Sequence, residues 1–193
     1  MRIVAGKYRS RRLQGPRAGK FRPTSDRVRE ALFNLLGPLG PGIAFADLYA
    51  GSGAIGLEAA SRGAGRIVLV ESSGSSCWTI RQNLRLLEPT EEIEVIQSRV
   101  ESFLAAQTER FNVVFADPPY ELDVPKVAAA LGAHPLLAPG GLLVLEHSRR
   151  QQAPARAGRL VQEQLRRYGD TQLALYREPL PSAGEDAPEV DEG

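Results

Sequence analysis

The sequence has little of what disulfide-bonded proteins, metal centres and membrane spans require. Its 193 residues include one cysteine, Cys77, and two histidines, His134 and His147. A lone cysteine forms no internal disulfide, which is typical of a reducing compartment, and so few thiols and imidazoles predict no Cys/His metal cluster. There is no run of about 18 apolar residues and no apolar segment near the N-terminus that would indicate a secretory signal. We therefore expect a cytoplasmic protein with no metal and no membrane segment.

Charged residues are nearly balanced in number but unevenly distributed. The net charge is +1, yet the first thirty residues carry ten Lys and Arg against Asp26 and Glu30, whereas residues 178–193 carry six acids and no base. So basic a segment favours a polyanion as partner. The acidic tail has almost nothing to bury and is expected to be disordered from about Pro181. These contrasts predict a basic arm, extended or a small hairpin (1–23), one domain (24–178) and an acidic tail (179–193).

Between the arm and the tail, short apolar runs alternate with segments of helical periodicity. The first helix is expected within TSDRVREALFNLLGP, with Thr24 or Ser25 as its cap and Gly37 as its stop. Such alternation predicts an α/β fold, a doubly wound and mostly parallel sheet with helices on both faces. Two later segments joined by Gly169-Asp170 predict a closing antiparallel hairpin. The parallel strands are expected at 43–50, 66–72, 92–98, 111–117 and 141–147.

A glycine-rich loop after the first predicted strand has two interpretations. Gly51, Gly53 and Gly56 have the spacing G-x-G-x-x-G, and Glu71 lies twenty residues beyond the first of them. This pattern fits a dinucleotide-binding loop, and hence an NAD-linked oxidoreductase. Asp47, four residues before the loop, would repel a pyrophosphate and would suit a cationic ligand. S-adenosylmethionine is such a ligand, and its ribose hydroxyls could donate to Glu71.

The fourth predicted strand ends in the sequence Asp117-Pro118-Pro119-Tyr120. Since ligands of open parallel sheets bind at the carboxyl ends of the strands, we expect Asp117 to share a crevice with the acids that end the earlier strands. Its carboxylate and the Pro118 carbonyl could accept both N–H groups of a nucleobase amine, which would localise the nitrogen lone pair for attack. Pro119 would fix the corner, and Tyr120 would stack on an extruded base.

The same four residues resemble the catalytic motif of amino-group N-methyltransferases that act on DNA, RNA or glutamine. More narrowly, four stretches together resemble the RsmD family of bacterial 16S rRNA guanine-N2 methyltransferases: RIVAGKYRSRRL, RPTSDRVREALFNLL, DLYAGSGAIGLEAASRGA and GDTQLALYR. The resemblance covers roughly residues 2–177. It implies a Rossmann-like class I fold, S-adenosylmethionine as methyl donor, and 16S rRNA of the small subunit or its assembly intermediate as substrate, with a monomeric enzyme.

The resemblance also assigns roles to individual positions. Residues 117–120 match the catalytic segment. The cofactor-binding positions it implies are Asp47, Tyr49, Gly51, Gly53, Glu71, Arg99 and Val100. The RNA-binding positions it implies are Arg2, Lys7, Arg9, Arg11, Arg12, Arg22, Thr24 and Arg27. Two positions depart from the family pattern. Ser73 replaces a common acid, and Arg99 stands where Asp or Asn usually reads the adenine amine, so backbone contacts near Arg99 and Val100 are expected to replace that hydrogen bond.

Three other functions remain open at this point. The glycine loop with Glu71 allows an NAD-dependent oxidoreductase, and residues 117–120 alone equally allow a DNA adenine-N6 methyltransferase. An RNA-binding module that has lost activity is disfavoured by the intact Asp-Pro-Pro-Tyr motif. The pair Glu146-His147 after the fifth predicted strand is interpreted as structural, because no partner for acid-base chemistry is identifiable in the sequence.

Overall fold

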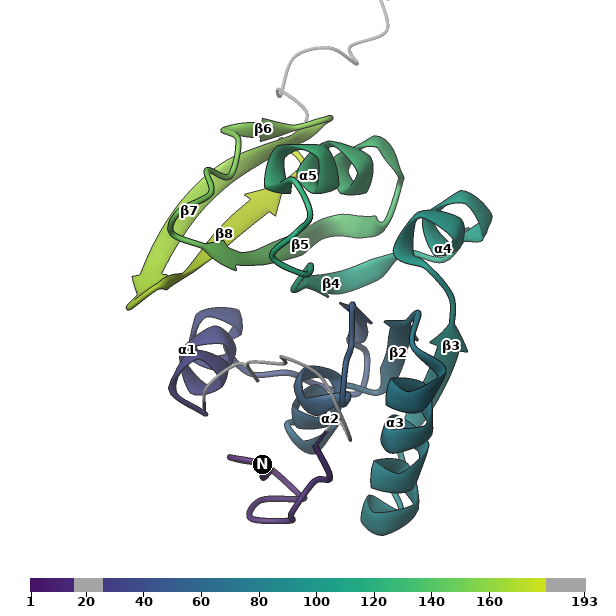
Figure 1. Ribbon diagram of the computed structural model, residues 1–193. Coiled ribbons are helices and arrows are strands. Elements are labelled where there is room, and N and C mark those ends of the chain that lie inside the picture. The colour runs from purple at the N-terminus through teal and green to yellow at the C-terminus, as the bar shows by residue number, and fades with distance from the viewer. Residues whose placement is uncertain (16–25, 180–193) are drawn as a thin grey trace, which may run out of the picture.

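The computed structural model describes residues 1–15 and 26–179, which fold around one mixed β-sheet (Figure 1). Its strand order is β3-β2-β1-β4-β5-β8-β7-β6. The strands are β1 (Ala44–Leu48), β2 (Arg66–Glu71), β3 (Glu92–Gln97), β4 (Phe111–Ala116), β5 (Leu137–Ser148), β6 (Arg156–Ala157), β7 (Leu160–Tyr168) and β8 (Thr171–Arg177). The helices are α1 (Asp26–Leu36), α2 (Ala54–Ser61), α3 (Gly74–Leu87), α4 (Val100–Ala106) and α5 (Val124–Ala133).

The sheet confirms the predicted fold class. Strands β1 to β5 run parallel, and β8 pairs antiparallel with both β5 and β7. The closing hairpin turns at Gly169, whose φ of 64° is one that glycine adopts without strain, between the paired residues Tyr168 and Thr171. The short β6 was not predicted. The sequence predicted that β5 starts at 141, because Pro139 and the glycines that follow it indicate a turn. In the structure the strand already begins at Leu137.

Helices cover both faces of the sheet, so its central strands are apolar along their whole length. Figure 1 shows α1, α2 and α3 on one side and α4 and α5 on the other. Phe45 and Phe115 belong to the core cluster on the α1–α3 side, whereas Ala46 and Val114 belong to the cluster on the α4–α5 side. Side chains of alternating residues therefore point to alternate cores, and the same alternation sets which way each strand-end residue points.

Two helices, α3 and α5, begin with a side-chain cap, whereas α2 and α4 begin at Gly53 and Arg99 without one. The Ser73 hydroxyl accepts from the Ser76 backbone N–H over 3.3 Å at the start of α3, and the Asp123 carboxylate accepts from Lys126 N over 3.0 Å at the start of α5. The caps expected for α1, Thr24 or Ser25, lie outside the described residues. No helix within residues 1–15 and 26–179 is long and apolar enough to cross a membrane.

The described part of the basic arm, residues 1–15, forms a small hairpin, one of the two forms considered from the sequence, with its two sides bridged at Arg2 and Arg12. It is docked on the domain rather than projecting from it, below α2 in Figure 1. Its apolar side chains share a small core with α2 and the end of α3, consisting of the buried residues Ile3, Tyr8, Leu13, Leu57 and Leu87. The arm therefore presents its charged residues from a fixed base.

A buried carboxylate anchors this hairpin. Glu58 of α2 is fully buried and accepts from the backbone N–H groups of Val4 at 2.7 Å and Ala5 at 2.9 Å. It also accepts from Arg62 Nε at 2.8 Å, and Arg29 Nε of α1 lies 3.7 Å away. Since a buried charge is tolerated only when it is paired and hydrogen-bonded, these contacts tie the arm, α1 and α2 into one unit.

Candidate active site

Two acids stand at the carboxyl ends of β2 and β4, the two strands that lie on either side of β1. Leu48 of β1 pairs with Val70 of β2 and with Ala116 of β4. Glu71 and Asp117 are the residues that follow these partners, so they flank the end of β1 on either side. Two of the three acids expected to share a crevice, Glu71 and Asp117, therefore stand at the same edge of the sheet.

Asp47 lies below this edge, inside the molecule. Its carboxylate is 2% exposed, and Oδ2 accepts from the Gly56 backbone N–H over 2.9 Å. The pKa of Asp47 is raised to about 7, mainly by burial; the Gly56 bond opposes this rise, and the charges of Asp117 and Glu71 contribute to it. Asp47 thus supports the start of α2 from beneath.

Glu71 joins the glycine loop to the end of β2. Its Oε2 accepts from the Gly51 N–H over 2.8 Å, and its Oε1 accepts from the Ser73 N–H over 2.7 Å. Oε1 also accepts from the Ser72 hydroxyl over 3.4 Å. Each carboxylate oxygen has two lone pairs, so Oε2 retains the capacity to accept one more hydrogen bond. The side chain is buried at 7% exposure. A sugar hydroxyl is a donor that this carboxylate can accept.

The loop between β1 and α2 needs its glycines for two different reasons. Gly51 and Gly53 have φ values of 57° and 77°, in the left-handed region that residues with a Cβ rarely adopt. Gly56 instead makes a close approach, since a Cβ there would lie 2.2 Å from Leu69 Cδ2. Tyr49 also has a positive φ, 63°, which is uncommon for a bulky residue and typical of functional turns.

The Asp-Pro-Pro-Tyr segment leaves the sheet as a fixed corner. Asp117 N donates to the Leu48 carbonyl over 3.4 Å, and the Pro119 carbonyl accepts from Leu122 N over 2.9 Å. No residue of 1–15 and 26–179 donates a hydrogen bond to the carbonyl of Pro118. Pro118 is buried, whereas Tyr120 is 58% exposed. An acceptor carbonyl and an accessible aromatic ring therefore accompany the acid.

The carboxyl of Asp117 is half-buried, and burial raises its pKa to about 7. Loss of hydration disfavours the charged form of a carboxyl group. A hydrogen-bond donor or a positive charge that approaches Asp117 therefore stabilises its ionised form in place of water. A perturbed acid at the mouth of a crevice is typical of catalytic sites.

A glutamine from the loop after β5 holds the segment that follows Pro119. Gln151 Nε2 donates to the Tyr120 carbonyl over 3.2 Å and to the Leu122 carbonyl over 3.1 Å. Its own backbone N–H donates to the Ser148 carbonyl over 3.0 Å. The end of β5 and the corner after β4 are therefore fixed relative to each other.

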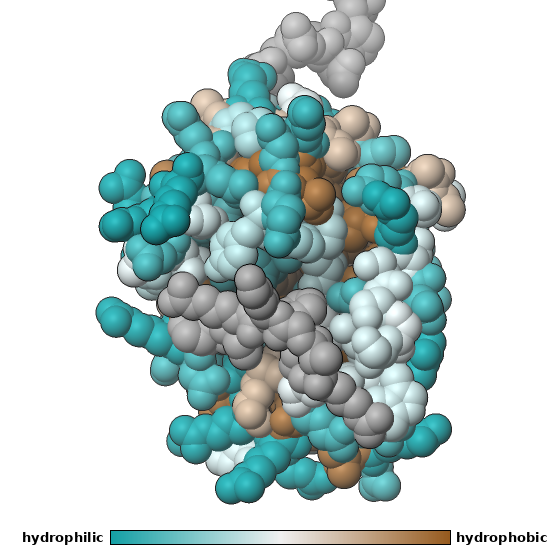
Figure 2. Space-filling model, in the orientation of Figure 1, coloured by the Kyte–Doolittle hydropathy of each residue, from teal (hydrophilic) through white to brown (hydrophobic). Residues whose placement is uncertain are grey.

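A cavity of about 230 Å³ opens beside the loop, between α4 and α5. It brings together Tyr49 and Val100, two of the predicted cofactor residues, with Leu122 from the segment beyond Tyr120. Burial raises the pKa of Tyr49 to about 12, so its hydroxyl remains protonated. Figure 2 shows apolar surface between the positions of α5 and α4 on this face of the molecule. An apolar, partly aromatic cavity suits a flat ring.

The two departures from the family pattern have simple structural roles. Ser73 caps α3, as described above. Arg99 is the residue before α4, and its side chain is 78% exposed and ion-paired with Glu101 over 3.5 Å. Val100 is buried in the core. The proposed backbone contacts of Arg99 and Val100 with a ligand stay predictions.

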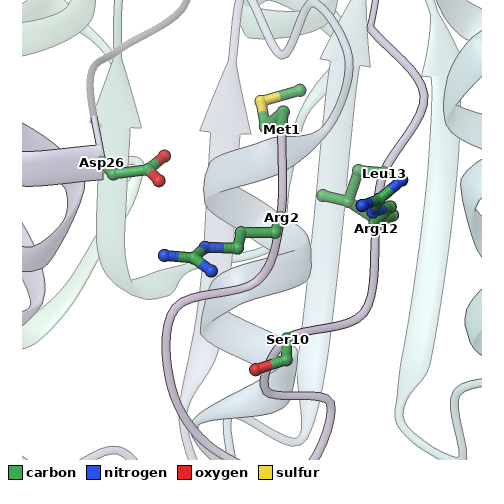
Figure 3. Close-up of a pocket in the computed structure, with 6 residues that line it drawn as sticks. All are labelled: Met1, Arg2, Ser10, Arg12, Leu13 and Asp26. Atoms are coloured by element: carbon green, nitrogen blue, oxygen red, sulfur yellow. The ribbon is translucent and has the colours of Figure 1, made fainter.

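The cationic residues of the hairpin face solvent, but not all are equally available. Lys7 Nζ pairs with Glu91 over 3.3 Å, and the Arg11 guanidinium donates to the Leu86 carbonyl. Arg2 and Arg12 instead border an open hollow of about 620 Å³ between the hairpin and the start of α1. Figure 3 shows the Arg2 side chain extending toward Asp26 across this hollow. Of the other predicted RNA-binding residues, Arg9 and Arg27 are exposed. Arg22 and Thr24 lie outside the described residues.

A family model described as "Conserved hypothetical protein 95" matches residues 1–177. The chain belongs to the RsmD family. YlbH of Bacillus subtilis (strain 168) is 34% identical over 181 residues, which are 92% of this chain and 98% of YlbH. "Ribosomal RNA small subunit methyltransferase D" of Escherichia coli (strain K12) is 42% identical over 120 residues, 62% of this chain and 60% of that protein.

Solved structures of RsmD-like proteins share the fold over nearly the whole chain. The Escherichia coli protein yhhF, whose structure is described as that of a methyltransferase, superposes with a TM-score of 0.79 at 34% identity, covering 93% of this chain and 99% of yhhF. The expected class I methyltransferase fold is therefore confirmed.

Sequence reasoning missed two residues that support the candidate site. Gln151 was not considered, because its partners are backbone carbonyls that leave no sequence signal. Glu58 was not singled out, although an acid within the apolar helix AIGLEAAS is itself a signal of a buried pair. Glu146, which the sequence analysis interpreted as structural, lies near the carboxyl end of β5, one residue beyond the partner of Ala116.

Proposed function

We propose that this protein transfers a methyl group from S-adenosylmethionine to the exocyclic N2 of a guanine in 16S rRNA. The observation that carries the proposal is the pair of acceptors at the end of β4. The Asp117 carboxylate and the Pro118 carbonyl lie on adjacent residues at one edge of the sheet, beside an accessible aromatic ring. Membership of the RsmD family and the name of the Escherichia coli relative support the choice of rRNA.

An amine on a nucleobase is a poor nucleophile, because its lone pair is delocalised into the ring. When Asp117 accepts one N–H and the Pro118 carbonyl accepts the other, the nitrogen becomes pyramidal and its lone pair points toward the electrophile. The carboxylate also stabilises the positive charge that develops on nitrogen in the transition state. Stacking on Tyr120 fixes the plane of the extruded base and offsets part of the free energy lost when the base leaves its stack in the RNA.

The residues present fit the methyl donor. S-adenosylmethionine, when bound, supplies an electrophilic methyl group on a sulfonium centre. Glu71 would accept from ribose hydroxyls, and Gly51 would let the backbone approach the ligand closely. The buried charge of Asp47 favours a cation above the loop and disfavours a pyrophosphate. Tyr49 and Val100 would border the adenine.

The hairpin would supply the RNA contacts. Its exposed cations, foremost Arg9 and Arg12, are presented from a base held by Glu58, so phosphate binding would orient the RNA relative to the crevice. Arg22 and Thr24 are expected to contribute where the chain passes from the hairpin to α1. The substrate is expected to be the small subunit or an assembly intermediate, with the enzyme as a monomer in the cytoplasm.

The experiment that tests this function uses methyl-labelled S-adenosylmethionine with small ribosomal subunits, naked 16S rRNA or duplex DNA. Label should enter RNA alone, and nuclease digestion followed by mass spectrometry should give N2-methylguanosine. Asp117→Ala should abolish incorporation without loss of cofactor affinity measured by calorimetry. Incorporation by Asp117→Ala at the wild-type rate, or label as N6-methyladenine in DNA, would refute the proposal.

A further inference from the structure

The pairing of β4 with β5 places a second acid beside the catalytic one. Ala116 of β4 pairs in parallel register with Leu145 of β5. The next residues along the two strands are Asp117 and Glu146, so these two acids lie side by side at the edge of the sheet. Neighbouring strands are about 4.8 Å apart, which puts both carboxylates within reach of one small ring.

The two acids also share a face of the sheet. The preceding pair in this register, two residues before each acid, is Phe115 with Val144, and both belong to the core on the α1–α3 side. On the other side of β5, Glu146 pairs with Leu173 of β8, which belongs to the same core. Because side chains alternate along a strand, Asp117 and Glu146 point to this face together.

Glu146 is 7% exposed at the end of an otherwise apolar strand. Acids are rarely buried to this degree, and the residues that precede this one in the strand are leucine and valine. Because the sheet register holds Glu146 next to Asp117, it is a candidate for contact with the same base.

The edge of guanine is complementary to two such acids. On the Watson–Crick side of guanine the N2 amine lies next to N1–H, a second donor, so two adjacent donors point the same way there; N3, on the other side of the amine, is an acceptor. The amine of adenine is flanked by N1 and that of cytosine by N3, and both of these nitrogens are acceptors. A carboxylate beside the amine-binding acid would therefore bind guanine and repel the other two bases.

We propose that Glu146 accepts the N1–H of the target guanine while Asp117 accepts from its N2 amine, so that Glu146 selects guanine among the bases that carry an exocyclic amine. The inference rests on the proposed function and names the residue that makes it specific for guanine. A site built to accept a hydrogen bond rejects an analogue without the donor strongly, because the buried acceptor is then left unpaired.

The test compares Glu146→Gln and Glu146→Asp with wild type on unmethylated small subunits, with methyl-labelled S-adenosylmethionine. The isosteric amide should lower kcat/KM for RNA by about 30-fold or more, and the shorter acid should give an intermediate loss. Cofactor affinity and the melting temperature report whether each variant is folded. Glu163→Gln, the same change at an exposed position of β7, is the matched control and should equal wild type.

A base analogue separates recognition from a general loss of activity. After the methylated position has been mapped, 16S rRNA carrying 2-aminopurine there keeps the N2 amine but has an acceptor at N1. Wild type should methylate this substrate at least ten-fold more slowly than guanine. Glu146→Gln can donate to N1, so its preference for guanine should shrink or reverse.

The outcomes keep the two proposals apart. If wild type and Glu146→Gln methylate RNA equally, with Asp117→Ala inactive, the role of Glu146 is refuted and the proposed function stands. If Glu146→Gln is slow but retains the wild-type preference against 2-aminopurine, Glu146 is not the N1 acceptor. If wild type labels no guanine in any RNA, both proposals fail.

Discussion

The side-chain amide of Gln151 donates to the carbonyl oxygen of Tyr120 over 3.2 Å, across 31 residues of chain. A second bond from the same nitrogen reaches Leu122. The aromatic ring proposed to stack on the base is exposed, so this clamp on its backbone restrains where the ring can lie.

Gln151→Ala should therefore loosen the corner without removing a reacting group. A hydrogen bond contributes about 0.5–1.5 kcal/mol, so losing the pair should raise the KM for RNA or lower kcat by about ten-fold. Steady-state kinetics on small subunits measures this, and calorimetry should give unchanged affinity for S-adenosylmethionine. Gln164→Ala, at an exposed position of β7, is the control. Wild-type kinetics for Gln151→Ala would show that the clamp is dispensable.

The rate of methyl transfer should depend on pH through Asp117. Its pKa is raised to about 7 by burial, and only the ionised carboxylate accepts the amine N–H. The value of kcat/KM should therefore rise between pH 6 and pH 8 and then level off. Asp117→Asn, with no ionisable group there, should lose most of the activity and the remaining rise should be weaker. A rate that is flat from pH 6 to 8 in wild type would contradict this role.

Asp47 should reduce stability at neutral pH. Its folded-state pKa of about 7 exceeds its ordinary value of 3.8, so the folded protein binds the proton more tightly than the unfolded chain does. Stability from this group is present at low pH and is lost as the pH rises toward 7, by up to roughly 4 kcal/mol. Asp47→Asn should therefore be more stable than wild type at pH 8 and similar at pH 4.

Urea denaturation of the ligand-free protein at both pH values measures that difference. The same variant should bind S-adenosylmethionine more weakly, because the charge that favours a cation is gone. Equal stability of the variant and wild type at pH 8 would mean that burial of Asp47 carries no such cost.

Removing Glu58 should destabilise the protein and release the arm. Glu58→Ala leaves Arg29 buried and leaves the Val4 and Ala5 N–H groups without their acceptor. Breaking a buried ion pair in this way costs about 3–5 kcal/mol. Thermal melting measures the loss, and hydrogen exchange at Val4 and Ala5 should accelerate.

The control for this change is Glu109→Ala, since Glu109 pairs with Arg66 at the surface. A surface pair contributes about 0–1 kcal/mol, so the melting temperature should hardly move. Equal losses of melting temperature for Glu58→Ala and Glu109→Ala would show that the buried acid contributes no more to stability than the surface acid.

Binding of RNA should weaken steeply with salt, and Arg9 and Arg12 should account for part of the slope. Each phosphate contact contributes roughly 0.7 to 0.9 log units of affinity per log unit of salt. Arg9→Ala with Arg12→Ala should lower the slope by about 1.4 to 1.8 in a filter-binding titration. Arg166→Ala, at an exposed position of β7, should leave the slope unchanged. An unchanged slope in the arm variant would assign the RNA contacts elsewhere.

The sequence was most informative where function depends on strand ends. Parallel strands bring their carboxyl ends to one edge, so the placement of Glu71 and Asp117 at the same edge followed from the alternation of elements. The burial of Asp47 beneath the glycine loop could not be predicted from the sequence, because it depends on the path of that loop. The position of Glu146 depends on the register between β4 and β5, which side-chain patterns alone do not fix.

The packing of the arm was also beyond the sequence. The sequence predicted a basic arm, extended or a small hairpin, but not that Ile3, Tyr8 and Leu13, which recur among the basic residues, are buried against the domain. Their hydrophobicity was the available signal, and its meaning required the partner surface on α2 and α3. The clamp by Gln151 left no comparable signal, since any backbone carbonyl can accept a hydrogen bond.

The bonds that Glu71 makes to Gly51 and Ser73 have a consequence for ligand affinity. A loop that must be ordered when a ligand arrives reduces the affinity by the conformational entropy it loses. Here one carboxylate already joins the glycine loop to the start of α3, and its buried position keeps water from competing for it. The crevice is thus preorganised, and most of the free energy of a ligand's contacts remains available as affinity.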